Sequence, residues 1–427
     1  MPFKPIATPE ESSQDDGSRS ARARRRLPDL LGLMRRAPAL DFDTLMDRIQ
    51  LASLPVTDED MACTTHLDHG RLLARQDRWD DLAHLIEHAD ATRLHTPAGV
   101  PATMLLADGA RSDLVSAARD AIADEADPDP TGIGTLEDVL ADQPRNYACA
   151  LVVALAHIDI GRAWRAAASP PTGAKHEVRF LAHFRRAEAL LAPFDAVNLD
   201  APSLAAAQCA LLAARPHPHH RVVDDYTRLI DLDPVSPLHM RALGEALLPA
   251  RHGNYETLER EARHAAARTT EIWGAGGYVW VYFDALTRDP GTLARLDVAL
   301  FVQGLHDIVS HKNDQHVINQ LSAFCGIVMA ARTGKVRRAA PNEVKRRRIH
   351  DCLDWLLEKH LQELHPVVWS QTLLSPGLTL VPSARRALID KGQQIALRTI
   401  AECFAEEIED GGSIAFSRSG MYRLPAL

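Results

Sequence analysis

The spacing of apolar residues along the chain predicts a protein built from helices. Between residues 343 and 364, apolar side chains recur every three or four positions, which places them on one face of a long helix. Residues 384–408 show the same spacing, with Ser383 as the expected N-cap and Gly411 and Gly412 as the expected end. The residues that follow, 412–422, are expected to form a small hairpin or an extended tail.

Short segments rich in proline and glycine separate the other helix-length stretches. Proline lacks a backbone N–H and glycine accepts backbone conformations that other residues avoid, so both favour turns. The breaks lie at 127–132, 169–173, 215–220, 289–291 and 334–341. Because the residues between them are rich in alanine, leucine, arginine and glutamate, which are strong helix formers, the sequence predicts an all-α protein.

The composition narrows the class of protein further. The chain has 427 residues, of which 46% are hydrophobic, 5% aromatic and 25% charged, and its formal net charge is -9. These values exclude a collagen-like, wholly disordered or disulfide-stapled chain. The six cysteines form no Cys-x-x-Cys pair, which indicates reduced thiols. No apolar run approaches the ~20 residues of a membrane-spanning helix, and the N-terminus lacks a secretory apolar region, so we expect a cytoplasmic protein without membrane contact.

An internal repeat is the most informative feature of the sequence. Residues 226–234 contain an aromatic residue, apolar residues at steps of three and a closing Asp-Pro pair. They are followed by the pair Leu243-Gly244 and then by Gly253-Asn254-Tyr255 at the expected start of a further helix. This order of residues resembles the tetratricopeptide repeat, in which a small residue lets two helix backbones approach where they cross.

A second copy of the pattern lies near the start of the chain. It contains Gly70, and its turn at 76–82 matches the turn at 252–258 position by position, with Trp79 in the place of Tyr255. The resemblance covers residues 60–290. It implies stacked helical hairpins, because one hairpin cannot bury its apolar face alone. It also implies a curved surface that binds a protein or peptide, so we expect a non-catalytic scaffold or adaptor whose oligomeric state is open.

The chain is accordingly expected to consist of four parts, forming a tetratricopeptide-like α-solenoid with a C-terminal helical subdomain. They are a mobile basic N-terminal tail at 1–40, helical repeats at 41–290, the C-terminal helical subdomain at 291–410 and the tail or hairpin at 411–427.

Helical spacing predicts which side chains of the two clear copies face the inner curve of the array. These candidate partner contacts are Arg71, Ala74, Arg241, Glu245 and Leu248.

A dense aromatic segment is a further candidate for partner binding. Its members include Trp273, Tyr278, Trp280 and Tyr282. Their bulk favours a core between a repeat and the next subdomain, and exposed aromatic side chains in a binding groove are the alternative.

Eight cations gather between residues 332 and 348 and suggest a different function. The basic stretch includes Arg337, Arg338, Lys345, Arg346, Arg347 and Arg348. Concentrated positive charge on an acidic protein could hold nucleic acid or a phosphate-rich ligand, and a solvated loop is the alternative.

Known catalytic patterns do not match the sequence, so no cofactor, metal or catalytic residue is expected. Nucleotide-binding loops and the His-Glu-x-x-His pattern are absent. His176 and His183 could share one helix face, and the loop with His217, His219 and His220 could capture a transition metal. A histidine-dependent metalloenzyme is therefore the third hypothesis.

Overall fold

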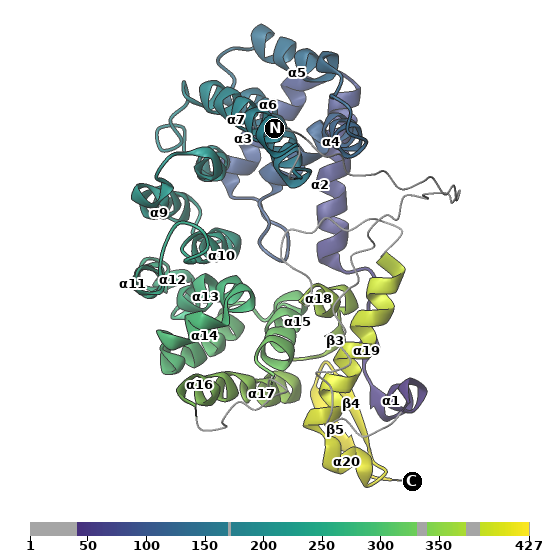
Figure 1. Ribbon diagram of the computed structural model, residues 1–427. Helices are drawn as coiled ribbons and strands as arrows, with labels where there is room; N and C mark the ends of the chain where they lie inside the picture. The colour runs from purple at the N-terminus through teal and green to yellow at the C-terminus, as the bar shows by residue number, and fades with distance from the viewer. Residues whose placement is uncertain (1–40, 170–171, 331–339, 373–384, 427) are drawn as a thin grey trace, which may run out of the picture.

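The computed structural model describes residues 41–169, 172–330, 340–372 and 385–426. These residues are mostly helical, as the sequence predicts (Figure 1). The α-helices are α1 (Phe42–Arg48), α2 (Asp58–Arg75), α3 (Trp79–Thr92), α4 (Ala102–Ala123), α5 (Pro130–Asp142), α6 (Tyr147–Ala166), α7 (Gly173–Leu191), α8 (Pro202–Leu211), α9 (Val222–Leu232), α10 (Pro237–Ala246), α11 (Tyr255–Arg268), α12 (Thr270–Trp273), α13 (Gly276–Arg288), α14 (Val298–His311), α15 (Gln315–Ala323), α16 (Pro341–His350), α17 (Cys352–Lys359), α18 (Pro366–Gln371), α19 (Arg385–Cys403) and α20 (Ala405–Glu409). The 3-10 turns are η2 (Leu212–Ala214), η3 (Pro218–His220) and η4 (Pro290–Ala294), and the π-helical turn is η5 (Phe324–Val328).

Short strands join the first described residues to the last ones. They are β1 (Ile49–Gln50), β2 (Ala52–Ser53), β3 (Glu363–Leu364), β4 (Ser413–Ser417) and β5 (Gly420–Leu424). β4 and β5 form the antiparallel hairpin that was one of the two expectations for this segment. β1 pairs in parallel with β4, and β2 with β3. The start of the described chain therefore belongs in space with the C-terminal helices, as the purple and yellow segments of Figure 1 show.

The apolar residues form two large buried clusters. One extends along the chain from Leu73 to Leu229 and fills the space between the helices from α2 to α9. The other contains Leu45 and Ile49 from the start of the described chain and then residues from Leu212 to Phe416. The expected boundary at residue 290 lies inside this second cluster.

Glycines mark the places where helices approach most closely. A Cβ atom on Gly70 of α2 would collide with the carbonyl oxygen of Leu106 in α4, and one on Gly109 of α4 with that of Leu67 in α2. Gly244 of α10 meets α13 in the same way. In both repeat copies the glycine thus contacts a helix that is not the next one in the sequence.

Most residues of α6 are buried. Asn146 caps the start of this helix by accepting hydrogen bonds from two backbone N–H groups. By length and composition it could cross a membrane, unlike any other helix in the described ranges. However, 78% of its apolar window is buried within the protein, which is typical of a core helix.

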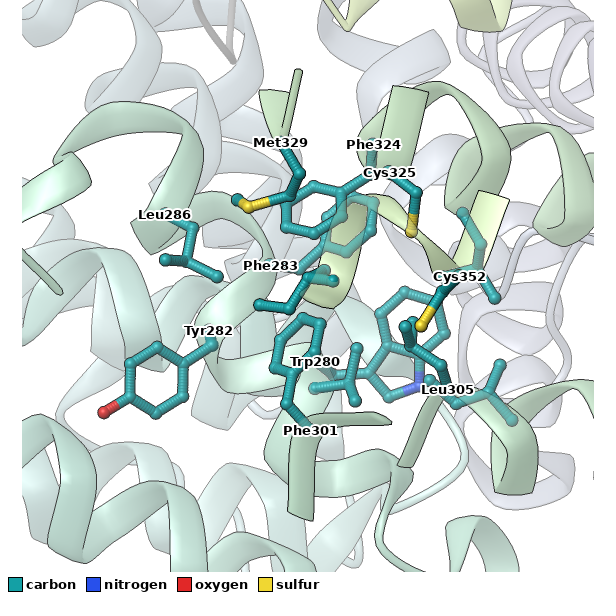
Figure 2. Close-up of a cluster of buried hydrophobic side chains, with 14 of the residues drawn as sticks. Trp280, Tyr282, Phe283, Leu286, Phe301, Leu305, Phe324, Cys325, Met329 and Cys352 are labelled. Atoms are coloured by element: carbon teal, nitrogen blue, oxygen red, sulfur yellow. The ribbon is translucent and has the colours of Figure 1, made fainter. Parts of the chain in front are cut away.

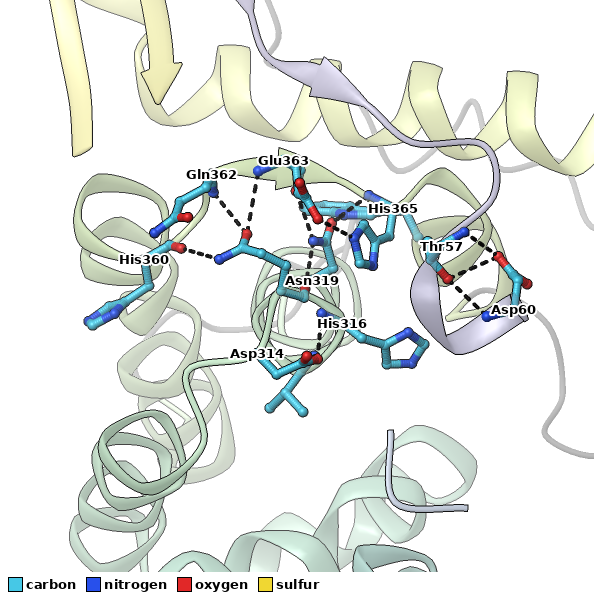
Figure 3. A network of polar contacts seen from close by, with 12 residues as sticks. Thr57, Asp60, Asp314, His316, Asn319, His360, Gln362, Glu363 and His365 are labelled. Atoms are coloured by element: carbon cyan, nitrogen blue, oxygen red, sulfur yellow. Dashed lines mark hydrogen bonds and ion pairs between the residues drawn. The ribbon is translucent and has the colours of Figure 1, made fainter. Parts of the chain in front are cut away.

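The long helix expected at 343–364 is divided at Asp351 into α16 and α17 and ends early, and the reason for the early end is tertiary. α17 ends at Lys359, and two side chains of α15 bind the backbone that follows (Figure 3). Gln315 donates to the carbonyl oxygen of His360 at 2.9 Å and accepts from the N–H of Gln362 at 2.9 Å. Asn319 accepts from the N–H of His365 at 3.0 Å. These contacts replace the helical hydrogen bonds of the segment.

The helix expected at 384–408 is present as α19 and α20, with a break at Phe404. Its expected cap, Ser383, lies outside the described residues. Gly411 follows α20 with a φ of 84°, a left-handed conformation that favours glycine and ends the helix as expected.

Candidate functional site

A groove of about 730 Å³ lies among the first helices of the chain. We call it the α2–α7 groove, because α2, α3, α4, α5, α6 and α7 each contribute side chains to its lining. Arg71 and Ala74, two of the residues predicted to face the inner curve, are among them. The volume lies within the range of about 300–1,000 Å³ that is usual for ligand pockets.

Most of the lining is apolar, for a reason visible in the sequence of α4. The alanines of α4 that line the groove leave space because their side chains end at Cβ; they are Ala110, Ala117, Ala118 and Ala121. Larger apolar side chains surround that space. They are Trp79, Leu114, Ile133, Leu136, Ile160 and Trp164.

α5 forms one wall of the groove and starts within the Pro-rich break that the sequence predicted. Asp129 accepts a hydrogen bond from the N–H of Thr131 at 2.9 Å, and Pro130 occupies the first helical turn, where its missing N–H costs nothing. The backbone hydrogen bond from Thr131 lowers the pKa of the Asp129 carboxyl.

Most of the charged groups that line the groove have a polar partner within the protein. Arg75 of α2 binds both carboxylate oxygens of Asp113 in α4, at 2.6 and 2.9 Å. Arg71 donates to the hydroxyl of Ser112 at 3.0 Å. Arg179 of α7 lies 3.3 Å from Asp127, in the loop before α5. These pairs leave the interior of the groove without a dominant charge.

A chain of three contacting side chains, from α5, α6 and α7, ends at the groove lining. Glu137 Oε1 lies 3.0 Å from His157 Nε2, and His157 Nδ1 lies 2.9 Å from His183 Nδ1. Glu137 also binds Arg186 through both carboxylate oxygens. The hydrogen bond from Arg186 is the largest contribution that lowers the pKa of Glu137.

Burial determines the protonation of the two histidines. It lowers the pKa of His157. It also lowers the pKa of His183 to about 4, and the neighbouring His157 and Arg179 lower it further in the same direction. Both imidazoles are therefore neutral near neutral pH. The sequence indicated His183 only as a partner of His176 in a metal site and gave no sign of Glu137 or His157, which approach it through folding.

The candidate partner contacts at residues 241–248 interact with other residues of the protein. Arg241 of α10 binds both carboxylate oxygens of Asp284 in α13, at 2.8 and 2.9 Å. Glu245 pairs with Arg288 of α13 at 2.7 Å. The side chain of Leu248 is buried. Burial corrects the expectation that Leu248 faces a partner, and the ion pairs show that Arg241 and Glu245 link α10 to α13.

The aromatic segment at 273–283 lies in the core, which is the interpretation that the sequence favoured (Figure 2). Trp273, Tyr278, Trp280 and Tyr282 are all buried, so their assignment to partner binding must be corrected. Both tyrosine hydroxyls donate to the same oxygen of Glu259, at 2.5 and 2.7 Å. Burial raises the pKa of both tyrosines.

The basic stretch is only partly free to bind a ligand. Arg337 and Arg338 lie outside the described residues. Lys345 donates to three backbone carbonyl oxygens, those of Leu293, Ala294 and Leu296, at 2.8–3.0 Å.

Arg346 is buried, pairs with Glu343 and donates to the carbonyl oxygens of Met329 and Ala330. Arg347 and Arg348 are exposed. Lys345 and Arg346 of the predicted patch therefore make structural contacts within the protein.

The structure does not bring His176 and His183 together as a metal site, and the rings of His217, His219 and His220 lie 4.0–6.4 Å apart. His176 packs against Trp164 at 5.1 Å between ring centroids, and its partner on the helix face, His183, faces the groove. The His217 loop is exposed. Within the described ranges, no group of three or more histidine, cysteine, aspartate or glutamate side chains could hold a metal ion.

Comparison with known proteins gives no relative. No protein-family model matches the chain, and no curated protein or solved structure is significantly similar to it. The geometry of the chain therefore carries the functional argument.

Proposed function

We propose that this chain is a non-catalytic interaction protein that binds a peptide segment of another protein in the α2–α7 groove. Its helices from α2 to α13 would form a degenerate tetratricopeptide-like array, with the C-terminal helices and strands as an added subdomain. We further propose that it acts in the cytoplasm. One observation carries the proposal: an apolar hollow of about 730 Å³ lies on the helices of the first repeat copy and includes Arg71 and Ala74.

The chemistry of the groove supports a peptide with an apolar anchor. Burying apolar side chains against a partner stabilises the complex by roughly 25 cal/mol per Å² of apolar surface removed from water. The paired charges at the rim, such as Arg75 with Asp113, can remain paired while such a partner binds. Recognition of an amphipathic segment through an apolar groove is a common mode of peptide binding.

A selection experiment tests the proposal. A display library of random peptides is selected on the full chain and on two variants of α4. Ala117→Trp places a large side chain in the groove at an exposed position. Ala123→Trp makes the same change at an exposed position of α4 outside the groove lining and serves as the matched control.

We expect peptides that bind the natural chain and Ala123→Trp with similar affinity and lose at least about tenfold on Ala117→Trp, since a filled hollow cannot take the anchor. Circular dichroism verifies that both variants keep their helices. Peptides that bind all three proteins equally, or a selection without any enriched peptide, would contradict the proposal.

A further inference from the structure

Glu137, His157 and His183 together determine where the protons of the two imidazoles lie. A carboxylate can only accept hydrogen bonds, so His157 must carry its hydrogen on Nε2, the atom that lies 3.0 Å from Glu137. A neutral imidazole has one N–H, and His157 Nδ1 is therefore an acceptor. His183 Nδ1, at 2.9 Å, must then be the donor of the next hydrogen bond.

This arrangement of protons determines the state of His183 Nε2. With its hydrogen on Nδ1, His183 has a lone pair on Nε2. No group in the described part of the chain is hydrogen-bonded to that nitrogen, and His183 belongs to the lining of the α2–α7 groove. Because the pKa of His183 lies at about 4, the ring stays neutral and Nε2 stays an acceptor near neutral pH.

The neighbours of His183 do not compete for this acceptor. Arg179, the cation that acts on His183, is paired with Asp127, and Arg186 is paired with Glu137. Most of the remaining lining is apolar and includes Trp164 and Leu136. A ligand that complements both features needs a large apolar body and a hydrogen-bond donor, without a formal charge.

Among protein side chains, tryptophan meets this description best. Its indole presents a large apolar surface and one N–H, which only donates. Tyrosine also brings acceptor lone pairs, which would need donors of their own, and phenylalanine would leave His183 Nε2 without a partner.

We propose that the α2–α7 groove recognises a tryptophan side chain of a partner peptide, with the indole N–H donating to His183 Nε2 and Glu137 and His157 holding that acceptor in place. This inference rests on the proposed function of the groove and names the anchor that the groove takes.

A pair of matched small probes tests the inference on the full chain. N-acetyl-tryptophanamide is titrated by NMR, and its indole-N-methyl analogue is titrated in the same way. The two compounds share their apolar body, and only the first has the N–H. We expect the methylated compound to bind about tenfold more weakly, which is the effect of one lost hydrogen bond with its acceptor left unpaired.

Protein variants locate the effect. His183→Phe keeps an aromatic ring without an acceptor, and the two probes should then bind with equal affinity. His217→Phe, in an exposed loop that does not belong to the groove, should retain the tenfold preference. Long-range ¹H–¹⁵N spectra of the ligand-free protein supply an independent readout, because they report which ring nitrogen carries hydrogen. We expect His183 to carry it on Nδ1.

The outcomes separate this inference from the proposed function. Equal binding of the two probes to the natural chain, no binding of N-acetyl-tryptophanamide, or a His183 hydrogen on Nε2 would each overturn the tryptophan anchor. The groove would still be a peptide site if selected peptides bind Ala117→Trp more weakly than the natural chain. If no selected peptide loses affinity for Ala117→Trp, the proposed function itself fails.

Discussion

Gly70 of α2 lies so close to the carbonyl oxygen of Leu106 in α4 that its position has no room for a Cβ atom. The two helices are separated in the sequence by α3, yet α2 packs more extensively against α4 than against α3. Gly109 of α4 faces Leu67 of α2 with the same constraint. Two glycines therefore set the distance between these helices, and with it the wall of the α2–α7 groove.

The first prediction concerns this helix contact. We expect Gly70→Ala to lower the free energy of unfolding by about 2–3 kcal/mol, because the added methyl group displaces the α4 backbone. Urea denaturation followed by circular dichroism measures the change. Gly134→Ala in α5 is the control, since a Cβ there meets no atom within 4 Å. It should raise stability by about 0.5–1 kcal/mol, as alanine favours helix more than glycine. Equal changes in the free energy of unfolding for both substitutions would show that the close contact at Gly70 does not limit the distance between α2 and α4.

The second prediction concerns pH. Asp233 is buried and its Oδ2 lies 2.9 Å from His239 Nε2 and 2.8 Å from His95 Nε2. Burial alone would raise the pKa of Asp233, but the hydrogen bonds from His239 and His95 outweigh it and hold the pKa well below its usual value. A carboxyl whose pKa is lower in the folded state stabilises the fold above its unfolded pKa of about 4, and this contribution is lost as the pH falls below that value.

Asp233→Asn should therefore cost about 2 kcal/mol near neutral pH, and the difference from the natural protein should shrink as the pH falls below about 4. Urea denaturation over a series of pH values measures both effects. Asp231→Asn removes a carboxylate from an exposed ion pair with Arg268 and should change stability by less than about 1 kcal/mol. A difference that grows on acidification would show that Asp233 is not the group responsible.

The third prediction concerns the basic stretch. Lys345→Met removes the donor of three hydrogen bonds to backbone carbonyl oxygens in and just after η4 and should lower stability by about 1–3 kcal/mol. Arg347→Met, at an exposed position of the same helix, should stay within about 0.5 kcal/mol of the natural protein. Thermal unfolding compares the two. If Lys345→Met leaves the unfolding temperature unchanged, the lysine has no structural role and is free to bind a ligand.

The fourth prediction compares two bidentate ion pairs of different exposure. The side chains of Arg241 and Asp284 are 17% and 13% exposed, and those of Arg75 and Asp113 are 61% and 56% exposed. Water weakens the attraction in the exposed pair. Double-mutant cycles with Arg→Met and Asp→Asn should give a coupling energy of about 1.5–3 kcal/mol for the first pair and less than about 1 kcal/mol for the second. The reverse order would mean that burial does not strengthen the α10–α13 contact.

Local features of the molecule could be read from the sequence because they depend on residues close together in the chain. The 3.6-residue spacing of apolar positions predicted the helices, and Gly411 marked the end of α20. The aromatic segment around Trp280 was expected to be core for its bulk, and it is buried. The hairpin of β4 and β5 was one of two stated outcomes.

Contacts between distant residues were decided by the tertiary structure. The sequence singled out Gly70 and Gly244 but did not show that Gly70 of α2 meets α4 and that Gly244 of α10 meets α13. It predicted helix through residues 360–364, where Gln315 and Asn319 instead bind the backbone. It also did not show that Arg241 pairs with Asp284 of α13.

The candidate site divides in the same way. The sequence by itself indicated that Arg71 and Ala74 share one face of a helix. Only folding brought Glu137 and His157 to His183, from helices α5, α6 and α7. Periodicity and capping act over a few residues along the backbone, whereas a hydrogen-bond chain needs side chains whose positions depend on how whole helices pack.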